Sequence, residues 1–248
     1  MRRFYVSPEA ATAAEIVLPA GEAHHALSVL RLKAGASVVV LDGQGKEFRG
    51  SFIPQGKRAA SVRVEETIQH PPPICQVTLF PAMLKGKLMD WVVEKATELG
   101  VTEIIPVITE NTVSHPAADR SVGKVAKWRT TAIAAIKQCG NPWLPEINAP
   151  QPLYEILRHR VPAELSLAAI LGEQAVSIRH AVDQCARVRS EPPRSIEYWV
   201  GPEGDFTSNE QEQLRGRGTI SVTLGPRVLR AETAVVTGVA MILGELIS

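Results

Sequence analysis

The pattern of apolar and polar positions changes near residue 70 of the chain. Before that point, five stretches bounded by turn signals predict β-strands, at residues 3–6, 15–18, 37–41, 47–53 and 60–68. The sequence DGQG at residues 42–45 is typical of a hairpin turn. One short helix is predicted from Glu22 to Leu30, where the apolar residues share a face. This part of the chain is therefore expected to form a small β barrel or sandwich.

Strands and helices alternate after Pro71-Pro72-Pro73. Three successive prolines can join neither a strand ladder nor a helix interior, so we expect a semi-rigid linker there. The pattern then predicts strands over residues 75–80, 103–109, 165–171, 196–200 and 220–224, helices over 86–99, 120–138 and 178–188, and a last helix through Ala234 and Leu246. Gly100 is expected to end the helix at 86–99. Strand, helix and strand at this spacing imply right-handed βαβ crossovers and a parallel sheet.

Three of the predicted strands end in loops that contain glycine. The strand at 196–200 continues into GPEGDF at residues 201–206, the strand at 220–224 into Gly225-Pro226, and the strand at 165–171 into Gly172-Glu173. The carboxyl ends of parallel strands meet at one edge of a sheet, where open α/β sheets bind ligands. These loops therefore predict a ligand site.

Helix starts follow two of these loops. Thr207 or Ser208 is suited to the N-cap position, with Glu210 or Gln211 placed to close a capping box. In the last loop, two arginines and Glu232 lie where strand becomes helix, and free N–H groups and the helix dipole favour polar ligand atoms there. A surface turn in which Arg230 and Glu232 pair is an equally good interpretation of the spacing.

Composition narrows the function classes. Of the 248 residues, 45% are apolar and 21% are charged, so the chain can form a sizeable core. The net charge is only +1, so the protein has no overall basic field and any nucleic-acid surface must be local. The three cysteines are too widely spaced for a disulfide framework or a CxxC site, and the six histidines show no HxH or HExxH spacing, so we expect no metal. No apolar run reaches the roughly 20 residues of a membrane span. MRRFYV at the start lacks a signal-peptide core, which predicts a cytoplasmic protein without membrane association.

The predicted helix at 120–138 carries cations without any acid. Its basic residues are Arg120, Lys124, Lys127, Arg129 and Lys137. A basic helix in a nearly neutral chain is either a phosphate-contacting face or a solubilising outer face, and the sequence leaves both open.

GPEGDFTSNE at residues 201–210 and LGPRVLRAETA at 224–234 together resemble the paired signature of bacterial small-subunit (16S) ribosomal RNA methyltransferases that modify uridine at N3, a family of the SPOUT class. HHALSVLRLKAG at residues 24–35 is similar to the start of their PUA-like RNA-binding barrel. The resemblance implies a PUA-like β barrel over 1–70 and an α/β SPOUT domain over 74–248, with a parallel sheet and a trefoil knot. It also implies S-adenosylmethionine as cofactor, ribosomal RNA as partner and a homodimer.

Site residues follow from the same resemblance. Those implied for the cofactor are Gly172, Gly201, Glu203, Gly204, Leu224, Gly225, Val228, Leu229 and Arg230. Arg230 is the candidate for stabilising charge on the uracil oxygen. Glu232 is the candidate proton acceptor, because it is the only carboxylate inside the longer motif, although Glu203 lies in the neighbouring loop. The candidates for RNA contact are His25, Arg31, Lys85, Lys87, Lys95, Lys124 and Lys127. A solvated helix face explains each of these basic residues singly just as well.

Three positions depart from the family pattern. Asn111 and Asn141 stand where the family typically has arginine, and Asp205 replaces the last glycine of its Gly-Pro-Glu-Gly-Gly loop. The missing arginines leave room for a SPOUT enzyme that acts on another RNA or on ribose oxygen. A non-catalytic RNA-binding protein of ribosome assembly is the other alternative. A Rossmann dehydrogenase is disfavoured, because no GxGxxG follows an early strand.

Overall fold

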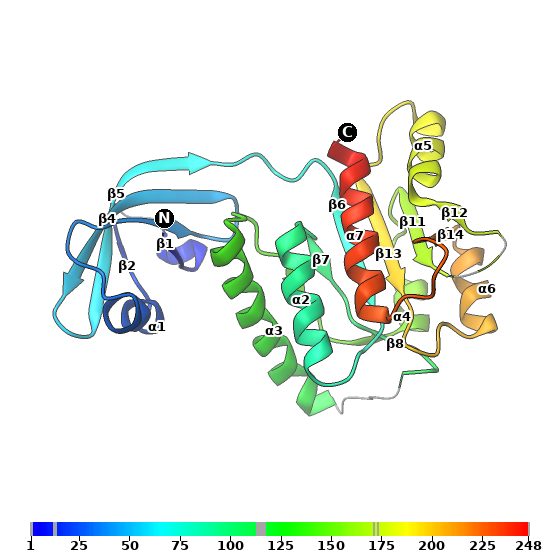
Figure 1. The fold of residues 1–248 in the computed structure, drawn as a ribbon, viewed down its shortest axis with the longest axis horizontal. Coiled ribbons are helices and arrows are strands. Elements are labelled where there is room, and N and C mark those ends of the chain that lie inside the picture. Colours follow the sequence, from blue (N-terminus) through cyan, green and yellow to red (C-terminus); the bar gives the residue numbers. More distant parts are fainter. Residues whose placement is uncertain (1, 12–13, 113–117, 171, 173, 248) are drawn as a thin grey trace. The chain divides into compact units, whose positions relative to one another are not determined.

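A computed structural model describes residues 2–11, 14–112, 118–170, 172 and 174–247. The chain forms two compact units, one of residues 1–72 with 133–144 and the other of residues 73–132 with 145–248 (Figure 1). The predicted domain boundaries ignore the segment 133–144, which the contacts group with the first unit.

The first unit is built on a five-stranded sheet. Its strands are β1 (Arg2–Tyr5), β2 (Glu15–Val17), β3 (Ser37–Leu41), β4 (Lys46–Gln55) and β5 (Ala59–Gln69), in the order β1-β3-β4-β5-β2. β1 pairs with β3 in parallel and the other pairs are antiparallel. Phe4, Val38, Phe52 and Val62 are fully buried between the sheet and the short helices. All five predicted strands are therefore confirmed, to within two residues or so at their ends.

Short helices complete this unit. A 3₁₀ turn η1 (Pro8–Ala10) follows β1, and α1 (Ala20–His24) continues directly as a π-helical turn η2 (His25–Val29). The predicted helix from Glu22 to Leu30 therefore starts two residues earlier and ends one residue earlier. Its buried residues, Ala23 and Ala26, lie on the predicted apolar face.

Trp143 joins the segment 133–144 to the hairpin of the first unit. Its Nε1 donates a hydrogen bond to the carbonyl of Pro71 at 3.1 Å. A Cβ added to Gly45 would lie 2.3 Å from the indole ring, and Gly45 has a φ of +89°. Only glycine fits under the indole, which explains the second glycine of DGQG.

A parallel seven-stranded sheet forms the centre of the second unit. Its order is β12 (Val176–Ser177), β14 (Ile220–Thr223), β11 (Leu165–Ala169), β13 (Ser195–Val200), β6 (Gln76–Pro81), β7 (Glu103–Ile104) and β9 (Glu146–Ile147). A separate parallel pair joins β8 (Val107–Ile108) to β10 (Gln151–Pro152). The predicted parallel sheet is confirmed. The single strand predicted over 103–109 is wrong, since Pro106 lacks an N–H and the segment divides into β7 and β8.

Helices cover both faces of this sheet. They are α2 (Lys87–Leu99), α3 (Ala118–Cys139, in this unit as far as Ala132), α4 (Leu153–His159), α5 (Ile178–Arg189), α6 (Ser208–Gly216) and α7 (Ala231–Ile247). α2 and α7 lie side by side on one face (Figure 1). Trp199 of β13 packs with α4 and α6 on the other face and stacks on Phe80 at 3.8 Å between ring centroids. α4 has no counterpart among the predicted elements.

Candidate functional site

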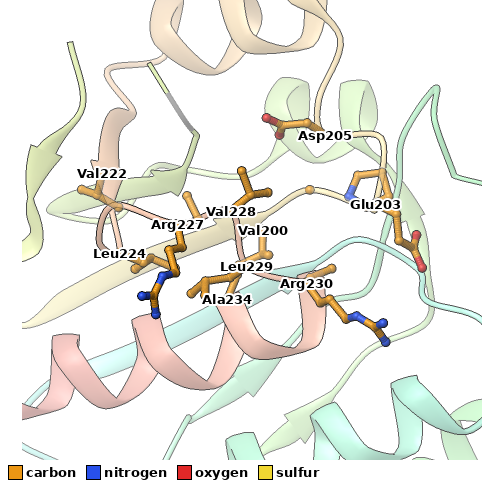
Figure 2. A pocket seen from close by; sticks show the side chains of 14 residues that line it. Val200, Glu203, Asp205, Val222, Leu224, Arg227, Val228, Leu229, Arg230 and Ala234 are labelled. Carbon is orange, nitrogen blue, oxygen red and sulfur yellow. The ribbon is translucent and has the colours of Figure 1, made fainter. Parts of the chain in front are cut away.

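A cavity of about 300 Å³ opens at the carboxyl ends of β13 and β14. Residues of the loop after β13, of the loop after β14 and of the first turn of α7 form its walls (Figure 2). The residues that line it are Ala169, Val200, Gly201, Pro202, Glu203, Asp205, Val222, Leu224, Arg227, Val228, Leu229, Arg230, Ala231 and Ala234. The predicted edge of the sheet therefore carries a cavity of a size that small-ligand sites have.

Local hydrogen bonds shape the loop after β13. A Cβ on Gly201 would lie 2.9 Å from Asp205 Oδ1 and 3.1 Å from the backbone nitrogen of Phe206, so the loop closes tightly over a glycine. Thr207 then caps α6 by accepting from the N–H of Glu210, whose own side chain accepts from the N–H of Thr207 at 2.9 Å. This capping box confirms one of the predicted alternatives.

The loop after β8 is hydrogen-bonded to the loop after β13 and to the first turn of α6. The buried carboxylate of Glu210 accepts a hydrogen bond from the N–H of Glu110 at 2.9 Å. Asn111 Nδ2 donates to the carbonyls of Gly204 at 3.0 Å and Asp205 at 2.9 Å. Two segments about 90 residues apart in the sequence are therefore fixed to each other beside the cavity.

The loop after β14 exposes its polar and apolar side chains together. Gly225 has a φ of +127°, and its N–H donates to Thr223 Oγ1 at 3.2 Å. Val228 is 81% exposed, which is unusual for an apolar side chain and leaves it available to a ligand. Arg227 and Arg230 are also exposed.

Helix α7 forms the floor of the cavity and is fixed to β13. Ala231 and Ala234 are buried and face the cavity. The hydroxyl of Tyr198 donates to the carbonyl of Ala234 at 3.0 Å, and burial raises the pKa of this tyrosine. Gly238 lies against the same hydroxyl, so that the helix comes as close to the strand as a glycine allows.

Most of the predicted cofactor residues meet at this cavity. Gly201, Glu203, Leu224, Val228, Leu229 and Arg230 line it, whereas Gly172, Gly204 and Gly225 do not. Leu171 and Glu173, which flank Gly172 in the third predicted loop, lie outside the described residues. Sequence reasoning missed five lining residues that stand inside the two quoted motifs, namely Pro202, Asp205, Arg227, Ala231 and Ala234.

The two predicted catalytic residues occupy different places. Arg230 lines the cavity, and its side chain extends toward the same side of the view as that of Glu203 (Figure 2). Glu232 is half-buried in the first turn of α7 and is not among the lining residues. Glu203 and Asp205 are therefore the carboxylates that line the cavity.

The predicted RNA-contacting residues are spread over both units. In the first unit, His25 and Arg31 are exposed, and Arg31 has a φ of +50°. In the second unit, Lys85 and Lys87 are exposed at the start of α2, and Lys124 is half-buried on α3.

Ion pairs already occupy two of the predicted RNA-contacting lysines. Lys95 bonds to Glu94 at 2.8 Å and to Glu98 at 2.9 Å, and Lys127 pairs with Asp90. At the family's other arginine position, Asn141 accepts a hydrogen bond from the N–H of Trp143 at 2.9 Å. The basic face of α3 is thus partly neutralised by the protein itself.

The described residues contain no group of three His, Cys, Asp or Glu side chains that could hold a metal ion. In the same part of the chain, no helix is both long and apolar enough to cross a bilayer.

Comparison with known proteins gives a consistent result over both units. A family model of the RNA methyltransferase domain matches residues 70–243, and one of the RNA methyltransferase PUA domain matches residues 18–65. The chain is 31% identical to ribosomal RNA small subunit methyltransferase E of Synechocystis, over 97% of this chain and 76% of that protein. It is 30% identical to the protein of the same name from Rickettsia conorii, over 97% and 94%.

Two solved structures share the fold over nearly the whole chain. A ribosomal RNA small subunit methyltransferase E of Neisseria gonorrhoeae bound to S-adenosyl methionine has a TM-score of 0.82 at 28% identity, covering 98% of this chain and 97% of that one. A Legionella pneumophila protein in complex with the bound cofactor SAM has a TM-score of 0.84 at 28% identity, covering 98% and 96%. The predicted fold class, a PUA domain before a parallel-sheet α/β domain of the SPOUT class, is confirmed; the trefoil knot stays a prediction. The chain therefore belongs to the RNA methyltransferase family whose curated members are named ribosomal RNA small subunit methyltransferase E.

Proposed function

We propose that this protein transfers a methyl group from S-adenosylmethionine to N3 of a uridine in small-subunit (16S) ribosomal RNA. The observation that carries the proposal is the cavity at the carboxyl ends of β13 and β14, because both signature loops of the family line it. The two related structures that hold S-adenosylmethionine superpose on nearly the whole chain, which supports the same cofactor here.

The residues of the cavity fit this cofactor. Val200, Val222, Leu224 and Leu229 provide an apolar wall for the adenine ring and the thioether carbons. The close turn at Gly201 brings backbone N–H and C=O groups to the cavity, where they can bond the adenine edge and the ribose hydroxyls. When bound, the cofactor supplies a methyl group on a positively charged sulfur.

Side chains at the cavity can accept the proton of uridine N3 and stabilise the negative charge that then develops on the uracil. Uridine N3 must lose its proton before its electron pair can accept a methyl group, and negative charge then develops on the uracil oxygens. Arg230, which lines the cavity together with Arg227, is the cation that stabilises this charge. Glu203, and in second place Glu232 in the first turn of α7, accepts the proton. Alignment of the two reactants contributes roughly 7–11 kcal/mol, so much of the catalysis is positioning.

RNA binding is local in this proposal. Lys85, Lys87 and Lys124 provide cations in the catalytic unit. Arg31 provides one in the PUA unit, where the exposed imidazole of His25 can contact the RNA as well. The target uridine lies in an unpaired segment or is extruded from a paired one, because N3 is otherwise engaged in base pairing.

The proposal includes a homodimer in the cytoplasm. The outer side of α7 exposes Ala240 and Met241, and Met241 is 38% exposed, so a small and a flexible apolar residue are available for a second copy. The inner side of the same helix is already buried against β13 and α2.

Methyl transfer with labelled cofactor tests the proposal. Purified protein is incubated with methyl-tritiated S-adenosylmethionine and either naked small-subunit RNA or the assembled particle, and the RNA is digested to nucleosides. We expect label in 3-methyluridine, its loss in Arg230→Ala, and its retention in Arg215→Ala, which removes an exposed arginine of α6 outside the cavity. Binding of the cofactor without transfer to either RNA would point instead to a non-catalytic RNA-binding protein, and label in ribose would point to another SPOUT activity.

A further inference from the structure

Asp205 holds an unusual backbone conformation at the end of the loop after β13. Its φ is +56°, and among the described residues only Arg31 and Ser190 share a positive φ without being glycine. Glycine adopts this region freely, whereas any side chain adds steric cost, although aspartate is among the residues that tolerate it best. A side chain at such a position is a reason to look for a function of that side chain.

Only one of the two carboxylate oxygens of Asp205 accepts a hydrogen bond within the described part of the chain. Oδ1 accepts a hydrogen bond from the N–H of Phe206 at 2.7 Å and lies over Gly201. Within the described part of the chain, Oδ2 has no hydrogen-bond partner. The side chain is half-buried and lines the cavity (Figure 2). One carboxylate oxygen is therefore available to a ligand in the cavity.

Asn111 holds the backbone of Asp205 in place. Its Nδ2 donates to the carbonyls of both Gly204 and Asp205, and its side chain lies 3.4 Å from the position a Cβ of Gly204 would take. The two positions where the chain departs from the family pattern beside the cavity are thus bonded to each other.

The charges around Asp205 make its ionisation sensitive to its surroundings. The groups on neighbouring elements are Glu203 on the same loop, Glu210 on α6, Glu110 on the loop after β8, and Arg227 and Arg230 on the loop after β14. Burial raises the pKa of Asp205, the N–H of Phe206 lowers it, and Glu210 raises it further, with a net upward shift. The carboxylate therefore becomes protonated at a higher pH than an ordinary aspartate.

We propose that Asp205 binds the methyl donor by accepting a hydrogen bond from one of its hydroxyl or amino groups, and that Asn111 is the positioning residue that holds Asp205 in its left-handed conformation. The inference rests on the proposed function, since it assigns one contact within that cofactor site. It adds a contact that the glycine of the usual family loop cannot make.

Titration calorimetry with S-adenosylmethionine separates a binding role from a structural one. Asp205→Gly relieves the backbone strain, so a purely structural aspartate predicts unchanged or tighter binding; we expect the Kd to rise about tenfold with no fall in Tm. Asn111→Ala should raise the Kd severalfold. Gln211→Ala is the matched control, because it removes a single amide bond to the carbonyl of Phe206 at 3.0 Å outside the cavity, and it should leave the Kd unchanged.

The pH dependence of the Kd provides the second test. Affinity of the wild type should fall as the pH drops through the raised pKa of Asp205, and this fall should be smaller in Asp205→Asn but persist in Asp183→Asn, which changes an exposed carboxyl of α5. The inference would be overturned if Asp205→Gly bound S-adenosylmethionine with the Kd of the wild type and if Asp205→Asn lost affinity in acid as much as the wild type does. The proposed function would then still stand, because the wild type binds the cofactor. Absence of any wild-type binding would overturn both.

Discussion

Gly238 is the position where a single methyl group should do the most damage to the cofactor site. A Cβ there would lie 1.9 Å from Tyr198 Oη and 2.2 Å from its Cζ, both closer than the 3.0 Å below which real Cβ contacts essentially never occur. Tyr198 is fully buried and its hydroxyl is bonded to Ala234, so neither the ring nor the strand can withdraw. Gly238→Ala must therefore push α7 away from β13.

The magnitude follows from three contributions. Overpacking costs about 1–3 kcal/mol, and loss of the Tyr198 hydrogen bond costs about 0.5–1.5 kcal/mol. The higher helix propensity of alanine returns about 1 kcal/mol. The net loss is about 2 kcal/mol, which for a chain of this length lowers Tm by about 4–8 °C. Because Ala231 and Ala234 on the same helix line the cavity, cofactor binding should weaken as well.

Gly244→Ala is the matched control on the same helix. A Cβ there meets no atom within 4 Å, so only the propensity gain applies and stability should rise by up to about 1 kcal/mol. Thermal unfolding and calorimetry of both variants with S-adenosylmethionine provide the comparison. If Gly238→Ala unfolds at the same temperature as Gly244→Ala and binds the cofactor like the wild type, the close contact of α7 and β13 is not as described.

Three further predictions concern stability. Arg217, whose side chain is 9% exposed, pairs with buried Glu197 and donates three hydrogen bonds to carbonyls at the end of α4. Arg217→Ala should therefore lower the free energy of unfolding, measured in urea, by about 3–5 kcal/mol. The control Arg215→Ala should stay within about 0.5 kcal/mol of the wild type. Thr207→Ala should lower stability by about 1 kcal/mol, because it opens the capping box; no change in Tm would contradict this. Although burial opposes its ionisation, the pKa of Glu47 is lowered by its cationic neighbours, so it stabilises the fold above its ordinary pKa of 4.5. The advantage of wild type over Glu47→Gln should therefore shrink as the pH falls through that lowered pKa, and a constant difference would refute it.

Local signals in the sequence predicted the elements and the loops well. The glycine at the end of α2, the capping box at Thr207 and the glycine turns after β13 and β14 depend on backbone conformations and hydrogen bonds between residues at most a few positions apart. Periodicity likewise found the strands of the first unit and the central strands of the parallel sheet, but not its two-residue edge strands β9 and β12. The division of residues 103–109 at Pro106 had a visible signal, because proline cannot donate within a ladder.

Contacts between residues far apart in the sequence could not be predicted from the pattern of apolar and polar positions. Asn111 and Asp205 were each noted as departures from the family, but nothing local shows that they bond to each other across 94 residues. The fit of Trp143 over Gly45 and of Tyr198 against Gly238 depends on tertiary packing of the same kind. Glu232 belongs to the strongest motif but is not among the residues that line the cavity, and its role as proton acceptor stays a prediction.

A crystal structure of the protein with S-adenosylmethionine tests the central claim most directly. The account predicts the adenosine between Leu224, Leu229 and the backbone of Gly201, with the reactive methyl group open to the side of Arg230. Electron density for the donor at any other place, with the cavity after β13 and β14 filled by the protein's own side chains, would contradict it.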